Sequence, residues 1–392
     1  MAAGRRAGGP VSGHWSDWRS GAPAYTLGVE EELMVLGGQR LQLEPAGPRA
    51  AEALPPHLRA VVSVETHASA LEVHTSIQER VSDAAAELAG LRAELAGELE
   101  AMGLRAASAG THPLSLGLDT TVSPQDRYQD LYRALGELAR REPTFALHVH
   151  VGLPTAEAAL RAYDSLRPAV PLLIGLAANS PFWRGRDSGL ASARTFVFGA
   201  FPRTGLPRAF ATYEQYVAAL DALINAGAIR DHTFVWWDLR LQPHLGTIEV
   251  RAMDAQVEAW ETAALVALVQ CLVRAAAEEG PGEAPPPEVL DENRFIAARD
   301  GVQACLIDDG RPTPLPVLLD RTLARLAPHA EDLGCVAELE AAADLARENG
   351  AARQRRAADE LGVTGIAGAL ADAYAAPATH DVVGSGSAEP AG

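Results

Sequence analysis

Four short segments of this 392-residue chain alternate apolar and ionisable residues, and this alternation constrains the fold more than any other feature. In an extended strand, successive side chains point to opposite faces of the sheet. Each segment therefore predicts a strand with one apolar and one ionisable face. In chain order, the ionisable residues are Glu30 and Glu32, Glu72 and His74, His148 and His150, and Glu249 and Arg251.

The first segment shows why one such strand is not enough to indicate function. Glu30 and Glu32 would lie on one face, roughly 7 Å apart along the strand. Neighbouring carboxylates repel each other unless water, Arg or a cation compensates them, so a solvated edge strand explains one such pair. Four such faces in one sheet predict a binding surface. Glu31 falls on the apolar face, where the sequence assigns it no role.

The order of the segments predicts an α+β fold. Strands and helical stretches do not alternate strictly, which favours a curved antiparallel sheet with helices packed on one face. We expect a flexible arm over residues 1–22, one catalytic domain over 23–375 that becomes helical from about 290, and a flexible tail over 376–392. The Gly-, Pro- and Arg-rich segment 180–205 predicts a long functional loop.

Composition excludes several classes of protein. The net charge of −18, from 51 acidic and 33 basic residues, argues against a nucleic-acid or anionic-membrane partner. The chain contains no lysine, which excludes a phosphate-binding-loop lysine and a Schiff base. No apolar run is suited to a signal sequence or a membrane span. The three cysteines, Cys271, Cys305 and Cys335, are far apart in the sequence, so we expect a reduced, cytoplasmic protein.

The residue types on the ionisable faces indicate a metal site. Glutamates with histidine suit Mg²⁺ or Mn²⁺ better than structural zinc, for which cysteine would be expected. Carboxylates around divalent ions, with Arg nearby, are what phosphoryl transfer from ATP requires. Two alternatives stay open: a metal-dependent hydrolase that uses the pair His148 and His150, and a non-catalytic ligand-binding protein.

Eight or more spaced motifs between residues 25 and 375 resemble those of the bacterial carboxylate-amine ligase family of the glutamate-cysteine ligase type, which is related in fold to glutamine synthetase. The matching stretches are Leu27-Gly28-Val29-Glu30-Glu31-Glu32-Leu33, Leu71-Glu72-Val73-His74-Thr75, Ala109-Gly110-Thr111-His112-Pro113, Leu147-His148-Val149-His150-Val151-Gly152, Ala178-Asn179-Ser180-Pro181-Phe182-Trp183, Ser192-Ala193-Arg194, Phe201-Pro202-Arg203-Thr204-Gly205, Gly246-Thr247-Ile248-Glu249-Val250-Arg251 and Gly350-Ala351-Ala352-Arg353-Gln354-Arg355.

This resemblance implies a glutamine-synthetase-like core in which the sheet curves around ATP and Mg²⁺ (or Mn²⁺). A substrate carboxylate is phosphorylated to an acyl phosphate, and an amine then displaces the phosphate. Carried over by motif, His150 lies near the nucleotide, Arg251 stabilises the transferring phosphoryl group, and Arg194 and Arg240 hold a substrate carboxylate. Glu249 is catalytic together with Arg251. The implied metal ligands are Glu30, Glu32, Glu72, His148 and Glu249.

The resemblance also implies amino-acid and amine substrates, and a homodimer as the family expectation. Two departures lie near the implied site: Phe145-Ala146, where the family often has Cys and Gly, and Arg240-Leu241-Gln242-Pro243, where an Arg-Pro pairing is more usual. The sequence therefore predicts an ATP-dependent carboxylate-amine ligase of γ-glutamyl type and leaves its amine acceptor, including cysteine, unidentified.

Overall fold

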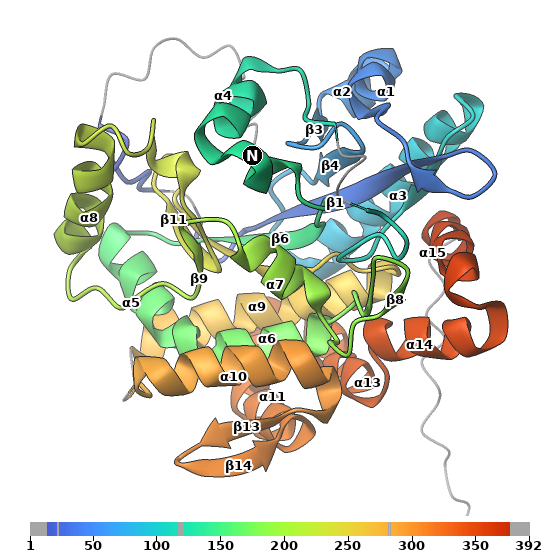
Figure 1. Ribbon diagram of the computed structural model, residues 1–392. Helices are drawn as coiled ribbons and strands as arrows, with labels where there is room; N and C mark the ends of the chain where they lie inside the picture. Colours follow the sequence, from blue (N-terminus) through green and yellow to red (C-terminus); the bar gives the residue numbers. More distant parts are fainter. Residues whose placement is uncertain (1–13, 22, 117–120, 281, 283, 377–392) are drawn as a thin grey trace, which may run out of the picture.

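The computed structural model describes residues 14–21, 23–116, 121–280, 282 and 284–376, and is built around one antiparallel sheet (Figure 1). The strands lie in the order β11, β12, β6, β1, β4, β3, while β2 and β5 pair with further parts of β1. The strands are β1 (Leu27–Gly37), β2 (Gln42–Leu43), β3 (Val62–Val64), β4 (Ala70–His74), β5 (Arg105–Ala107), β6 (Ala146–Gly152), β11 (Leu239–Gln242) and β12 (Thr247–Asp254).

The register of the sheet follows the alternation in the sequence. Glu30 pairs with His74 on one side and with His148 on the other, and Glu249 pairs with His150. Residues directly opposite each other in neighbouring strands share a face. All four ionisable strand faces therefore lie on the same side of one sheet, as predicted.

Valines mark the opposite, apolar face. Val29 pairs with Val149, which also pairs with Val250, and all three side chains are buried in the main core. The α+β fold with helices packed on this face is confirmed.

The central helix of that layer is α9 (Ala259–Glu279), which begins with a capping box between Glu258 and Glu261. By length and composition α9 could cross a membrane, but 78% of its apolar window is buried inside the fold, as expected of a core helix. Helices α3, α5 and α11 pack against it, and α6 packs between β12 and α10 (Figure 1). The other helices of this layer are α3 (Val81–Ala101), α5 (Ala156–Leu166), α6 (Val170–Ala177), α10 (Pro287–Asp300) and α11 (Leu315–Leu333).

The ionisable face is covered by shorter elements. Segment 180–205 was expected to be a loop, but it contains a seven-residue helix, α7, whose N-cap Ser192 accepts a hydrogen bond from the Thr195 amide. The glycine and arginine residues around this short helix are typical of a loop, so a prediction from composition missed it. These covering elements are α4 (Asp126–Leu135), the 3₁₀ turn Gly136–Arg140, β7 (Phe182–Trp183), β8 (Arg186–Asp187), α7 (Ala193–Gly199), β9 (Thr204–Gly205) and β10 (Trp236–Trp237).

The region after residue 290 is largely helical, with one exception. Strands β13 (Cys305–Asp308) and β14 (Arg311–Pro314) form a hairpin whose two turn residues, Asp309 and Gly310, have φ values of 47° and 71°. An Asp-Gly pair adopts this left-handed turn readily, so the sequence held a hairpin signal that the helical prediction overlooked. The remaining helices are α1 (Gly47–Ala53), α2 (Pro56–Arg59), α8 (Tyr213–Asn225), α12 (Val336–Glu340), α13 (Ala342–Arg347), α14 (Gly350–Leu361) and α15 (Ile366–Ala375).

Part of the predicted N-terminal arm lies against the fold. The Trp15 indole donates to Asp221 Oδ1 over 2.7 Å, and the Trp18 indole donates to the Leu153 carbonyl over 3.2 Å. Residues 1–13, 22 and 377–392, which include almost all of the predicted tail, fall outside the described residues. The predicted domain boundaries stay a prediction.

Candidate active site

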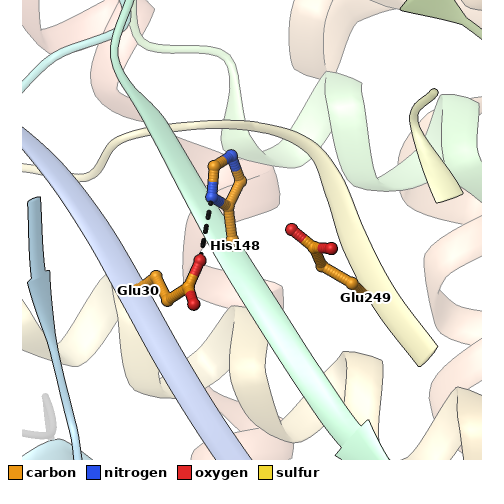
Figure 2. A group of neighbouring side chains, drawn as sticks. All are labelled: Glu30, His148 and Glu249. Atoms are coloured by element: carbon orange, nitrogen blue, oxygen red, sulfur yellow. Dashed lines mark ion pairs between the residues drawn. The ribbon is translucent and has the colours of Figure 1, made fainter. Parts of the chain in front are cut away.

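The ionisable face brings together glutamate and histidine side chains from the central strands of the sheet. His148 of β6 lies between Glu30 of β1 and Glu249 of β12 (Figure 2). The distance from His148 Nδ1 to Glu30 Oε2 is 3.5 Å, and His150 Nε2 lies 3.4 Å from Glu30 Oε1 and 3.7 Å from Glu249 Oε1. One ligand atom from each of Glu30, His148 and Glu249 lies within 4.8 Å of the others.

A second group adjoins the first and shares His148 with it. Glu32 of β1 and Glu72 of β4 face each other in register, and with His148 they offer three ligand atoms within 4.8 Å of one another. The distance from His148 Nδ1 to Glu72 Oε2 is 3.8 Å. All five predicted metal ligands therefore lie in two adjoining groups, each able to hold a cation.

Buried polar atoms of the site without a hydrogen-bond partner fit a bound cation. Among the described residues, Glu30 Oε2 and His148 Nδ1 are buried without a hydrogen-bond partner, as is His150 Nε2. Buried polar atoms in folded proteins are usually paired, so unpaired ones at a site commonly indicate a missing ligand. Carboxylate oxygen atoms with the imidazole nitrogen of His148 form a donor set suited to Mg²⁺ or Mn²⁺.

The protonation of this first group favours metal binding. Burial, together with the charge of Arg251, lowers the pKa of His148 to about 3, so its imidazole is neutral at physiological pH. Burial alone would raise the pKa of Glu30, but the charge of His150 and contacts with His148 outweigh it and hold that pKa well below its usual range. A neutral imidazole beside an ionised carboxylate is the form in which both bind a metal.

The two carboxyl groups of the second group hold their protons more tightly than ordinary glutamates do. Burial and the nearby charge of Glu65 raise the pKa of Glu32 to about 7. Burial and the charges of Glu30 and Glu65 raise the pKa of Glu72 well above its usual range. Carboxylates shifted in this way bind a proton in the absence of a cation and release it when a cation is bound.

Glu249 is held by a cage of donors. Arg240 donates to both carboxylate oxygens, from Nε over 2.8 Å and from Nη2 over 3.0 Å, and Gln242 Nε2 donates over 2.6 Å. Arg251 Nη1 donates to Oε1 as well. Although burial raises the pKa of Glu249, the two arginines outweigh it and hold that pKa well below its usual range.

The predicted substrate-binding arginines differ in their availability. Both are buried, but Arg240 is occupied by Glu249 and by the Val235 carbonyl, 3.0 Å away. Arg194 donates to the backbone carbonyls of Arg251 and Ala252, and its Nε has no hydrogen-bond partner among the described residues. Only Arg194 of this pair lines the cavity beside the acidic groups.

That cavity, of about 80 Å³, contains residues that the sequence reasoning missed. The cavity is lined by four residues that the sequence predicted, Glu32, His148, Arg194 and Arg251. It is also lined by Glu65 and by an aromatic wall of Phe198, Phe201 and Trp236. Glu65 follows β3 and has no alternating pattern around it, so period-two reasoning could not find it. Phe198 belongs to α7, Phe201 follows it, and Trp236 belongs to β10, so two of the three wall residues come from the segment that was predicted to be a loop.

Comparison with known proteins identifies the family. Residues 26–376 match the model of glutamate-cysteine ligase family 2. The chain belongs to that family. It is therefore a ligase of the carboxylate-amine type acting on small molecules, as the sequence predicted, and the alternative of a metal-dependent hydrolase is not favoured.

Individual relatives agree with this assignment. The chain is 42% identical over 338 residues to a Rubrobacter xylanophilus protein whose name places it among the glutamate-cysteine ligases 2, and the match covers 85% of this chain and 92% of the relative. A Jannaschia relative whose name also places it among the glutamate-cysteine ligases 2 is 36% identical over 338 residues. The match covers 85% of this chain and 89% of the relative.

Solved structures agree with the fold of this glutamate-cysteine ligase family 2 member. A glutamate-cysteine ligase from Francisella tularensis, crystallised with AMP, superposes with a TM-score of 0.65 at 11% identity, over 92% of this chain and 90% of that chain. A bifunctional glutathione synthetase from Pasteurella multocida superposes with the same TM-score of 0.65 at 14% identity, over 91% of this chain and 53% of that chain.

Proposed function

We propose that this chain is an ATP- and Mg²⁺-dependent ligase that joins the γ-carboxylate of glutamate to an amine through an acyl phosphate. The observation that carries the proposal is the pair of adjoining acidic groups that share His148, with Arg251 and Arg194 at the same cavity. Family membership supports the reaction class, and the substrate glutamate is taken from the names of the relatives.

The metal-binding role falls to residues on both sides of His148. Glu30 and Glu249 would hold one divalent ion, and Glu32 and Glu72 a second, with His148 available to either. Glu65, which lines the same cavity, would add negative charge beside the second ion. Divalent ions bound here would neutralise the phosphate oxygens of ATP.

The arginines have different roles toward the phosphoryl group and the substrate carboxylate. Arg251 lines the cavity next to Glu249, so its guanidinium is placed to stabilise charge on a phosphoryl group. The free Nε of Arg194 is placed to bind a substrate carboxylate. For Arg240 we propose a different role from that implied by the resemblance: it orients Glu249. His150, between Glu30 and Glu249, completes the nucleotide side of the site.

An isotope experiment tests the reaction. Purified protein is incubated with ATP, Mg²⁺, glutamate labelled with ¹⁸O in its γ-carboxylate and, one at a time, a panel of amines that begins with cysteine. We expect ADP, an amide and phosphate that carries one ¹⁸O atom, because the acyl oxygen leaves with the phosphate. Release of AMP and pyrophosphate, or of unlabelled phosphate, would contradict the acyl-phosphate route.

A variant links this reaction to the site. Glu249→Gln keeps the size of the side chain but removes the negative charge, and we expect it to reduce turnover by at least a hundredfold. Glu94→Gln on α3, an exposed carboxylate that pairs with His57, is the matched control and should leave turnover unchanged. Full activity of the Glu249→Gln variant would place the reaction elsewhere.

A further inference from the structure

The middle carboxylate of β1 has a role of its own on the back of the sheet. Glu31 points away from the candidate site, is fully buried and pairs in register with Val73 and Leu147. Its Oε2 accepts from Arg92 Nε over 3.0 Å and from Nη2 over 2.5 Å, and its Oε1 accepts from Ser108 Oγ over 3.0 Å. The Glu31 carboxylate, whose cross-strand neighbours are both apolar, thus accepts three hydrogen bonds.

Arg92 ties this point of β1 to two other elements. It belongs to α3, and its Nη1 donates to the Val257 carbonyl over 2.9 Å. Its Nη2 lies 3.1 Å from the Gln256 carbonyl and 3.2 Å from Thr262 Oγ1, at the start of α9. One buried guanidinium therefore joins β1, α3 and α9 directly behind the two acidic groups.

Stability alone does not account for such a pair. Replacing a buried ion pair by apolar residues of similar volume is often neutral or stabilising, whereas fixing register is the best-attested use of buried polar groups. Register is a specific problem for β1, because Glu30, Glu31 and Glu32 are consecutive carboxylates. A slip of one residue would turn Glu31 toward the site and both of its neighbours away from it.

We propose that the Glu31–Arg92 ion pair fixes the register of β1, so that Glu30 and Glu32, and not Glu31, face the metal and nucleotide site. Glu31 and Arg92 are positioning residues that touch neither substrate nor metal. The inference rests on the proposed function only in assigning metals to the opposite face. Because a strand side chain and its two neighbours point in opposite directions, holding Glu31 on the back orients both ligand residues.

The test replaces the pair by uncharged side chains of similar size and keeps a polar residue at position 31, so that the apolar face of β1 is not extended. For Glu31→Gln/Arg92→Met we measure Mn²⁺ affinity by titration, hydrogen exchange of residues 27–37, and the midpoint of thermal unfolding. We expect Mn²⁺ affinity to fall at least tenfold and exchange in β1 to become faster, while the protein remains folded. The proposal is overturned if affinity and exchange stay within twofold of the wild type.

Milder variants keep the test decisive if the double variant does not fold. Ser108→Ala removes a single hydrogen bond to Glu31, and we expect Mn²⁺ affinity to fall two- to fivefold, whereas unchanged affinity would count against the proposal. Arg274→Met, which breaks surface ion pairs with Glu278 and Asp332, is the control and should leave affinity unchanged.

The wild type separates this inference from the proposed function. If the wild-type protein binds Mn²⁺ but does not turn over ATP, the proposed reaction fails and the role of the pair is still measured by affinity. If the wild type binds no Mn²⁺, the metal assignment fails, and hydrogen exchange in β1 alone decides whether the pair fixes the register.

Discussion

The orientation of a carboxylate in this site is fixed by the hydrogen-bond donors around it, and Glu249 is the clearest case. Both of its oxygens are occupied by Arg240, whose planar fork fits a carboxylate in two places. Lysine offers a single point charge, so in Arg240→Lys we expect Glu249 to lose its fixed orientation. Mn²⁺ affinity, measured by titration, should fall about tenfold, which corresponds to about 1.4 kcal/mol.

The control for this prediction is Arg230→Lys, at an exposed arginine that pairs with Asp130. Its Mn²⁺ affinity should equal that of the wild type. An Arg240→Lys variant with normal Mn²⁺ affinity but a raised KM for glutamate would restore the role implied by the resemblance, in which this arginine binds a substrate carboxylate.

His67 links the stability of the fold to pH. It is buried, and burial lowers the pKa of its imidazole to about 4 from an ordinary value of 6.5. Between these two pH values the unfolded chain binds a proton that the folded chain does not, so stability falls as pH decreases from 6.5 to 4. Over this range the shift corresponds to about 3 kcal/mol.

The variant His67→Gln tests this dependence. Its free energy of unfolding, measured with urea at several pH values, should fall less steeply between pH 6.5 and 4 than that of the wild type. The same substitution at His57, which is exposed on the surface, is the matched control. Parallel curves for the wild type and His67→Gln would show that the buried imidazole does not contribute.

At the scale of elements, the connection between β5 and the site depends on one close approach. A Cβ atom on Gly110 would lie 2.6 Å from Asp254 Cγ and 2.8 Å from Ser180 Oγ, where Asp254 ends β12. Asp254 accepts hydrogen bonds from Ser180 and Ser192 and so holds the segment before α7 against the sheet. We expect Gly110→Ala to lower the free energy of unfolding by about 1–3 kcal/mol.

A second glycine provides the control. Gly97 lies inside α3, and a Cβ atom there would meet nothing within 4 Å. Because alanine is the better helix former, Gly97→Ala should raise the free energy of unfolding by about 0.5–1 kcal/mol. Urea unfolding of both variants decides the matter, and equal effects of the same sign would contradict the steric argument.

The elements that the sequence predicted well are those with a strong period. The strands that carry the acidic groups follow from the alternation of apolar and ionisable residues. The elements it missed, such as α7 and the β13–β14 hairpin, are short, so local turn residues and contacts with the rest of the fold decide them.

The same distinction holds within the site. Glu30, Glu32, Glu72, His148 and Glu249 were predictable because the period of two places them on one face. Glu65 was not, because long-range packing brings it to the site without any sequence pattern. The role of Glu31 needed the fold as well, since its partner Arg92 lies 61 residues away in the sequence.

On the scale of the whole molecule, the sheet gathers like charges that the fold must tolerate when no cation is present. Glu30 and Glu32 come from β1, and Glu72 and Glu249 from β4 and β12, so the two acidic groups together draw on strands across the sheet. A ligand that binds only the folded state stabilises it by about 2.7 kcal/mol at a hundred times its dissociation constant. Divalent cations should therefore stabilise the entire fold.

The expected result is a higher urea midpoint in Mg²⁺ or Mn²⁺ than after chelation by EDTA, and a further rise when ATP is added with the metal. Sodium chloride at matched ionic strength controls for screening, which weakens repulsion between exposed charges but acts little on buried ones. Glu72→Gln should reduce the response to Mn²⁺, because it removes one ligand of the second group. If sodium chloride stabilises the protein as much as Mn²⁺ does, the carboxylates are relieved by screening alone, and the acidic face is not a specific cation site.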